Sequence, residues 1–275
     1  MISRRQRSIS YAILLAFSVI AVWPIVAIVL LAFNKPGTLT YGLGLPAQWS
    51  LDSFAKAWTE GGIGPAMFHS FIVASAVVIL ALVLSLMTGY AFGTMKFRGR
   101  EPLFYFLLLG IMIPYQATII PLYYDFQFIH LTNTYLALIL PQMAFSVPFG
   151  TFWMRAYFRG FPKELLEAAR IDGANVWQVL WRVAVPNAGP AALALSLILF
   201  IWTWNDLLIA IVMIQNPDMQ MAPAVLAFFA GAQRGPELPT VAAAAVLVAL
   251  PIVAIYSLLQ RRYIEGVVAG AVTGE

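Results

Sequence analysis

Six long apolar segments constrain the fold of this chain more than any other feature of its sequence. A helix needs about 20 mainly apolar residues to cross the roughly 30 Å hydrocarbon core of a bilayer. The six segments reach that length, and Asp206 is the one formal charge inside any of them. They span residues 10–33, 67–95, 103–124, 132–154, 188–214 and 240–259. The sequence therefore predicts an all-α membrane protein with six transmembrane helices.

The composition argues against a soluble globular domain. Of the 275 residues, 61% are hydrophobic and 10% are charged, whereas about a quarter of the residues in a soluble domain are charged. The first apolar segment follows Arg4, Arg5 and Arg7, as in a signal peptide. It is too long for a signal peptide, however, and no small-residue cleavage site follows it. We therefore expect an uncleaved first helix.

The positions of the basic residues predict the orientation. If the N-terminus is inside and the segments alternate, all but three of the 16 Lys and Arg residues fall in inside segments. The three outside are Lys35, Lys56 and Arg234. Because Lys and Arg concentrate in cytoplasmic loops, we expect both termini in the cytoplasm of a bacterium or archaeon, and the chain in its cytoplasmic membrane. This pattern also accounts for the net charge of +4 without a nucleic-acid partner.

Several kinds of chemistry lack the residues that they need. The chain has no cysteine, which excludes disulfides, thiolate metal sites and cysteine nucleophiles. His69 and His130 lie far apart in sequence without a metal-ligand spacing. There is no P-loop motif for ATP, and no His/Asp/Ser or Glu/His cluster inside the apolar segments would suit an intramembrane enzyme. We expect no metal, no cofactor and no enzymatic activity in this chain.

Small residues and prolines inside the segments bear on helix packing. Ser85, Gly89 and Gly93 recur every fourth residue, a spacing that lets helix backbones approach closely and that favours core packing. The third and fourth segments contain four prolines, Pro114, Pro121, Pro141 and Pro148. Each proline removes a backbone donor and should kink its helix. Such kinks can shape a cavity, although ordinary helix bundles contain them too.

The long inside loop, residues 155–187, has the signals of two short helices. Gly173 suits the left-handed residue that ends a helix. Asn175 with Gln178 resembles a capping box that opens a second helix, and Pro186 should stop that helix. The sequence therefore predicts two helices joined at a glycine, projecting between the fourth and fifth segments.

One face of the first loop helix combines small and apolar residues. Leu165, Ala168, Ala169 and Asp172 recur at i, i+3, i+4 and i+7, which places them on one side. The alanines leave room for another protein surface. A hairpin lying on the bilayer surface is an equal alternative from the residues alone.

The same loop carries a resemblance to a known family. The run Glu167-Ala168-Ala169, with a glycine four residues later and a late proline, resembles the EAA loop of binding-protein-dependent ABC importer permeases. In that family the loop docks into a cleft on a separate ATPase subunit. The resemblance implies ATPase-coupling roles for Glu167, Ala168, Ala169, Asp172 and Gly173.

A second motif narrows the resemblance to carbohydrate importers. Residues 202–206, Trp-Thr-Trp-Asn-Asp, resemble the Trp-Asn signature of permeases that carry carbohydrates. We expect Trp204, Asn205 and Asp206 to face a substrate pathway, with an interfacial cap as the alternative. We expect the fifth segment to be one helix, in which Asp206 lies about 27 Å along the axis from Ala188.

The end of the chain completes the resemblance and implies a domain organisation. Residues 250–274 resemble the C-terminus of MalG-like permeases, except that Thr273 stands where that family usually has lysine. The family implies a MetI-like transmembrane domain of the type I importer fold, with a cytoplasmic coupling helix. Its parts would be an N-terminal tail, first helix and outer loop (1–66), a permease core of five helices (67–262) and a cytoplasmic C-terminal tail (263–275).

The resemblance also implies partners. They are a second, non-identical permease subunit, a dimer of ATPase subunits that binds ATP and Mg²⁺, an extracytoplasmic solute-binding protein, the lipid bilayer and a sugar or oligosaccharide. Glycerol phosphates and other polyols are an alternative cargo. A secondary transporter is an alternative function, but it predicts inverted repeats and ionisable residues at the bilayer midplane. No repeat is evident, and Asp206 alone is a poor candidate for ion coupling.

Overall fold

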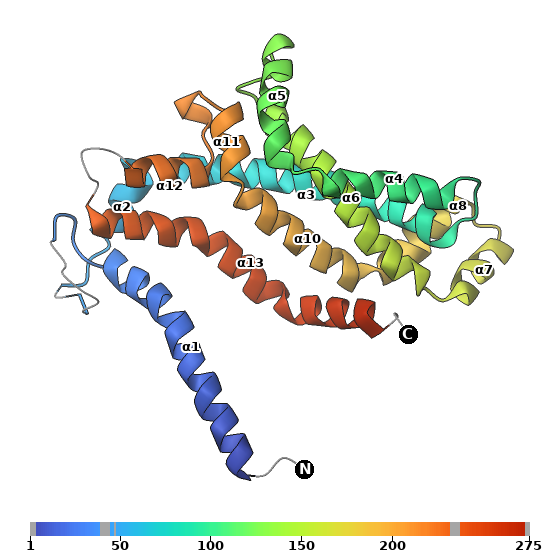
Figure 1. Cartoon of the computed structure of the whole chain (residues 1–275), viewed down its shortest axis with the longest axis horizontal. Helices are drawn as coiled ribbons and strands as arrows, with labels where there is room; N and C mark the ends of the chain where they lie inside the picture. Colours follow the sequence, from blue (N-terminus) through green and yellow to red (C-terminus); the bar gives the residue numbers. More distant parts are fainter. Residues whose placement is uncertain (1–3, 39–44, 47, 232–236, 273–275) are drawn as a thin grey trace. The chain divides into compact units, whose positions relative to one another are not determined.

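The described part of the chain is built from helices. The computed structural model describes residues 4–38, 45, 46, 48–231 and 237–272, and it contains no strand in these ranges. The elements are α1 (Arg4–Ala32), α2 (Asp52–Thr59), α3 (Ile63–Thr94), α4 (Arg100–Met112), α5 (Tyr115–Phe128), α6 (Tyr135–Arg159), α7 (Lys163–Ile171), α8 (Val176–Gln178), the π-helix η1 (Val179–Ala184), α9 (Val185–Asn187), α10 (Gly189–Trp204), α11 (Leu207–Met213), the 3-10 helix η2 (Pro217–Met219), α12 (Ala222–Gly231) and α13 (Leu238–Val272) (Figure 1). The predicted all-α class is confirmed.

Six spans can be counted in the described helices. Four helices are long and apolar enough to cross a membrane by themselves, over 9–32, 63–94, 135–159 and 238–260. Two further pairs pass the same test together but are bent, α4 with α5 by 88° and residues 176–187 with α10 by 79°. If each bent pair is one span, the total is six, as the sequence predicts.

The third predicted segment, 103–124, is broken at Pro114. The chain leaves α4 through Ile113, which is extended with φ −77° and ψ 120°. A proline clashes with an α-helical residue before it, so Ile113 is driven out of the helical region. Figure 1 shows the resulting bend between α4 and α5.

The fifth predicted segment, 188–214, is not one helix, and that prediction is wrong. α10 ends at Trp204, and α11 begins at Leu207. Asp206 lies in the break with an extended backbone, and its carboxylate accepts a hydrogen bond from the Ile209 N–H at 3.4 Å. Aspartate favours this capping position because its oxygen satisfies a free donor of the first turn. The run is apolar on both sides of Asn205 and Asp206, and Asp206 starts a new helix within it.

The chain divides into two compact units, residues 1–67 with 224–251 and residues 68–223 with 252–275. In the first unit, Ser53 Oγ donates to the Asn34 carbonyl at 2.7 Å. Lys56 pairs with Glu237 at 3.2 Å. These contacts tie α2 to the residues that follow α1 and precede α13.

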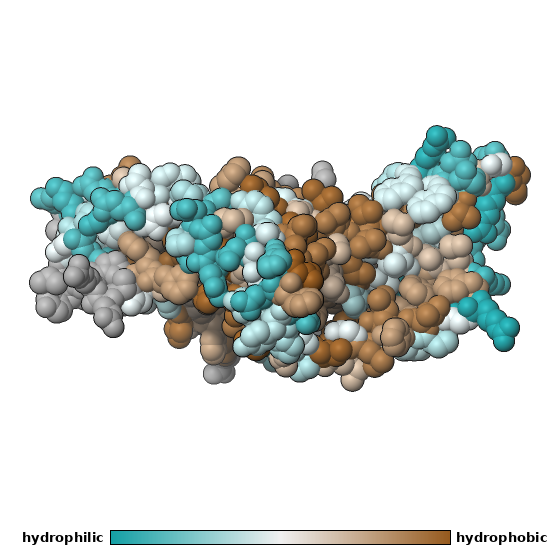
Figure 2. Space-filling model, turned by 90° about the horizontal axis from the view of Figure 1, so that it is seen from above, coloured by the Kyte–Doolittle hydropathy of each residue, from teal (hydrophilic) through white to brown (hydrophobic). Residues whose placement is uncertain are grey.

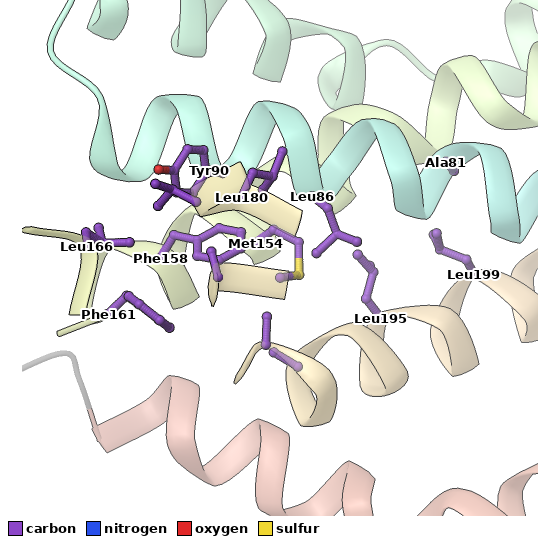
Figure 3. Packing of buried hydrophobic residues seen from close by; sticks show 14 residues of the cluster. Ala81, Leu86, Tyr90, Met154, Phe158, Phe161, Leu166, Leu180, Leu195 and Leu199 are labelled. Atoms are coloured by element: carbon purple, nitrogen blue, oxygen red, sulfur yellow. The ribbon is translucent and has the colours of Figure 1, made fainter. Parts of the chain in front are cut away.

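A buried cluster holds the second unit together. It joins α3, α6, α7, η1 and α10, and its largest members include Tyr90, Met154, Phe158 and Leu195 (Figure 3). A Cβ added at Gly89 would lie 2.5 Å from Met154 Cβ, and one at Gly93 would lie 2.8 Å from Phe158 Cβ. No real Cβ atoms approach so closely, so the glycines are required for the contact of α3 with α6. The predicted role of the small-residue face in core packing is confirmed.

Large apolar side chains also lie on the surface. Figure 2 shows extended apolar patches on the face in view. On α1, Leu15, Phe17 and Ile20 are exposed, as are Phe106 and Met112 on α4. Apolar patches of this extent mark contact with lipid or with partner proteins.

The last helix changes the description of the C-terminus. α13 runs to Val272, so most of the segment predicted as a tail, 263–275, is helical. Residues 273–275, which include Thr273, lie outside the described residues.

Candidate functional site

The loop 155–187 contains the predicted glycine junction. α7 ends at Ile171, and Gly173 has φ +81°. The Ala174 N–H closes the turn by donating to the Ala169 carbonyl at 3.0 Å. Asn175 and Gln178 then form a reciprocal capping box, with both hydrogen bonds at 2.9 Å. The predicted left-handed glycine and capping box are confirmed.

Pro186 does not stop the second loop helix, and that prediction is wrong. After α8 the helix continues as η1 and then as α9 to Asn187. Pro186 is the second residue of α9. The π-helical turn η1 lies directly before it, and such a local adjustment accommodates a proline within a helix. The chain turns by 79° only after Asn187, where α10 begins.

The residues predicted to share one face of α7 are divided between an outward face and a face that packs on the rest of the chain. Leu166 is buried in the cluster with Phe161, Phe158 and Leu180 (Figure 3), and Ala169, one turn after Leu166, packs against the same cluster. Ala169 therefore lies against its own chain and does not share the outward face. The spacing of the residues predicts which of them lie on the same side of α7. Which side is buried depends on the helices that pack against α7, and the spacing does not reveal it.

The outward surface of the loop is rich in apolar side chains. Ile171 is 86% exposed, and Leu165, Val176, Trp177 and Trp181 are exposed as well. The predicted coupling residues Glu167, Ala168, Asp172 and Gly173 are also exposed. Exposed apolar side chains beside charged ones mark a surface that binds a protein or a membrane.

The loop is firmly attached to the helices below it. Val179, Leu180 and Ala184 of η1 are buried in the cluster. Tyr157 on α6 donates to the Asn187 carbonyl at 2.7 Å, and Trp153 Nε1 donates to the Ala191 carbonyl at 3.1 Å. The loop is therefore packed and hydrogen-bonded against α6, which is itself bonded to α10.

A buried arginine joins three helices near the loop. Arg155 of α6 is buried, and its Nη2 lies 2.6 Å from Glu101 Oε2 on α4. Its Nε donates to the Phe92 carbonyl of α3 at 3.3 Å, and its guanidinium lies 3.7 Å from the centre of the Phe104 ring. Because the cation is paired, hydrogen-bonded and stacked, it can remain buried and fix these helix ends together.

A cavity of about 670 Å³ lies where α6 meets two helix breaks, the one between α4 and α5 and the one between α10 and α11. The α4–α5 break contributes Pro114 and Tyr115, and the α10–α11 break contributes Asn205 and Asp206. Helix breaks at membrane depth are tolerated where they line a cavity, because the freed backbone groups can then find partners. The wall also includes Gln116, Gln142, Ser146, Phe149 and Trp202.

A hydrogen bond connects the two breaks. Tyr115 Oη donates to Asp206 Oδ1 at 2.9 Å, and Asp206 also caps α11. Asn205 Nδ2 donates to the Ile201 carbonyl at 2.8 Å. Asp206 thus lines the cavity and caps α11 at the same time.

Trp204 is placed differently from the prediction. It is 2% exposed and stacks on Phe200 with ring centres 5.4 Å apart, so it gives no ring face to the large cavity. Trp202 is 50% exposed and lines the cavity beside Phe149, with ring centres 4.7 Å apart. Two residues that are two positions apart in a helix point to nearly opposite sides. The sequence contains no local signal that Trp202, and not Trp204, would point to the cavity.

Comparison with known proteins places the chain in a family. The family described as "Binding-protein-dependent transport system inner membrane component" matches residues 85–267, which include both the loop and the cavity. The chain belongs to this family. It is therefore a membrane subunit of an ABC importer, a non-catalytic permease. No three His, Asp or Glu residues in the described ranges lie close enough to hold a metal ion.

Several curated relatives of this permease match over nearly their whole length. The diacetylchitobiose uptake permease NgcG of Streptomyces coelicolor is 32% identical over 98% of this chain and 88% of the relative. The arabinooligosaccharides permease AraQ of Halalkalibacterium halodurans is 33% identical over 93% and 92%. The trehalose permease SugB of Mycobacterium tuberculosis is 31% identical over 92% and 93%.

Solved structures confirm the fold of this permease. A chain from a bacterial ABC transporter that imports the acidic polysaccharide alginate has a TM-score of 0.80 at 24% identity, covering 95% of this chain and 98% of that one. A chain of the MetNI methionine transporter has a TM-score of 0.57 at 16% identity, covering 74% and 94%. The structure therefore has the transmembrane fold of ABC importers, as predicted.

Proposed function

We propose that this permease imports a sugar or oligosaccharide and forms half of the translocation pathway, with a second, non-identical permease as the other half. The relatives named for diacetylchitobiose, arabinooligosaccharides and trehalose support a carbohydrate cargo. The observation that carries the proposal is the cavity at the two helix breaks. It combines an aromatic platform of Trp202 and Phe149 with hydrogen-bonding side chains, the combination that saccharide binding requires.

In this proposal the loop 155–187 couples the permease to a dimer of ATPase subunits, which bind ATP and Mg²⁺. The outward residues Glu167, Ala168, Asp172 and Gly173 would contact the ATPase. Ala169 would support the loop from within, because it packs on the cluster of this chain. Closure of the ATPase dimer on ATP would push the loop, and its attachment to α6 and α10 would pass the movement to the cavity.

The remaining features of the proposal concern topology and delivery. Both termini would lie in the cytoplasm of a bacterium or archaeon. Residues 67–262 would form the permease core, with 1–66 before it and the C-terminal segment 263–275 after it. An extracytoplasmic solute-binding protein would deliver the cargo when the cavity faces outwards. The importer of the alginate neighbour has such a periplasmic protein bound.

Substrate-stimulated ATP hydrolysis tests this proposal. The chain would be purified with its partner permease, its ATPase and its binding protein, and reconstituted in nanodiscs. We expect trehalose, diacetylchitobiose or arabinotriose to stimulate hydrolysis when the binding protein is present. A control complex with an inactive ATPase should show none. Stimulation by amino acids alone, with no response to any saccharide, would refute the carbohydrate assignment.

A further inference from the structure

The cavity wall contains a buried amide oxygen without a hydrogen-bond partner among the described residues. Gln142 of α6 is 8% exposed, and its Oε1 has no hydrogen-bond partner among the described residues. The same side chain lines the large cavity and a small one beside it. A buried polar atom left unpaired costs about 1–3 kcal/mol, so an orphaned amide in a cavity wall indicates a bound polar group. Because an amide both donates and accepts, it suits a sugar hydroxyl.

The cavity wall carries a negatively charged residue and no positively charged one. Asp206 is the one acidic residue among the lining residues, all of which lie in the described ranges, and none of them is Lys, Arg or His. The nearest basic residue on α6 is Arg155, 13 positions after Gln142 and therefore about 20 Å along the helix. Arg155 is already engaged with Glu101. No cation on these walls can neutralise an anionic cargo.

We infer, resting on the proposed carbohydrate function, that this cavity takes uncharged saccharides and excludes sugars that carry a carboxylate or phosphate. Gln142 binds a hydroxyl of the sugar, the rings of Trp202 and Phe149 cover its apolar face, and Asp206 repels anions. The alginate importer shares the fold with an acidic cargo, so the fold itself does not set the charge of the substrate. The wall residues do.

The charge of Asp206 gives the size of the effect. Two like charges 6 Å apart at an effective dielectric constant of 20 repel enough to weaken binding about 100-fold. Asp206→Asn keeps an oxygen that can cap α11 and accept from Tyr115, while it removes the charge. The variant should therefore fold and should narrow the discrimination against anions by about 10- to 100-fold, with little change for a neutral sugar.

The test uses neutral and acidic probes on the complete transporter in nanodiscs. The neutral probes are trehalose, diacetylchitobiose and arabinotriose, and the acidic probe is an alginate trisaccharide. Binding is followed by the change in tryptophan fluorescence of the complete transporter as each probe is titrated. We expect a neutral probe to bind at least about tenfold more tightly than the alginate trisaccharide.

Two pairs of variants sharpen the test. Gln116 is an exposed lining residue, so Gln116→Lys places a cation in the wall and should admit the acidic probe, whereas Gln116→Leu should not. Gln142→Leu should weaken neutral-sugar binding about 5- to 30-fold. Leu140→Met, at an exposed position of the same helix, should change nothing. Size-exclusion profiles check that each complex assembles.

The outcomes separate this inference from the proposed function. Equal binding of both kinds of probe by the unmodified transporter would overturn the charge exclusion and leave carbohydrate import intact. Unchanged neutral-sugar binding in Gln142→Leu would overturn the role of Gln142. A transporter that binds no saccharide of either kind, while amino acids stimulate its ATPase, would refute the proposed function itself.

Discussion

Gly173 allows a substitution series that separates backbone conformation from side-chain bulk. Its φ is +81°, and a Cβ at this position would meet nothing within 4 Å. Substitution therefore causes no clash inside the chain, and its whole intramolecular cost comes from the left-handed backbone. That cost is ~1–2 kcal/mol for a residue such as alanine. Asparagine tolerates the conformation better, and valine tolerates it less well because it is β-branched.

The strain should lower the population of the loop geometry that docks on the ATPase. A cost of ~1–2 kcal/mol corresponds to a factor of about 5–30 in that population. We expect coupling to fall in the order Gly173, Gly173→Asn, Gly173→Ala, Gly173→Val. The assays are co-purification of the ATPase subunits and substrate-stimulated ATP hydrolysis. Membrane insertion should be unchanged, since no lipid-facing helix is altered.

Two results would refute this reasoning. If Gly173→Val kept full coupling, the glycine junction would not position the docking surface, and a loop lying on the bilayer surface would be the better interpretation. If Gly173→Asn were as impaired as Gly173→Val, the cause would be bulk against the partner and not the backbone angle.

Three further predictions follow from the packing and the topology. Ala169→Leu should destabilise the permease by about 1–3 kcal/mol, because the larger side chain overpacks the cluster. Ala168→Leu should keep the melting temperature of the unmodified permease and weaken ATPase co-purification. Equal melting temperatures of the two variants would contradict this. Gly89→Ala should lower the melting temperature, because its Cβ would lie 2.5 Å from Met154 Cβ, and an unchanged value would disprove the close contact of α3 with α6. The chain lacks cysteine, so single introduced cysteines report the topology. Glu60→Cys should react with an impermeant reagent in intact cells, while Arg159→Cys and Gln260→Cys should react only after permeabilisation. The reverse pattern would overturn the orientation.

Local signals in the sequence predicted the features that local physics controls. The lengths of the apolar segments determine how many helices can span the bilayer. The left-handed turn at Gly173 and the capping box of Asn175 with Gln178 depend on residues within a few positions of one another. Both could therefore be predicted without knowledge of the rest of the fold.

The features that the sequence did not predict depend on neighbours. Asp206 begins a new helix inside a long apolar run, where the hydropathy averaged over the run predicts one continuous helix. Ala169 points inward because the cluster lies on that side of α7. Trp202, and not Trp204, lines the large cavity because of the direction in which the last turn of α10 points each side chain. The orphaned amide of Gln142 has no local signal at all, because it becomes apparent only when α6 meets both breaks.

Uptake into proteoliposomes tests the central claim most directly. The permease would be reconstituted with its partner permease and ATPase, with ATP in the compartment that corresponds to the cytoplasm and labelled sugar with binding protein outside. We predict accumulation of trehalose, diacetylchitobiose or arabinotriose that requires both ATP and the binding protein. Uptake that proceeds without ATP and follows an imposed proton or sodium gradient would contradict the assignment as an ABC importer permease.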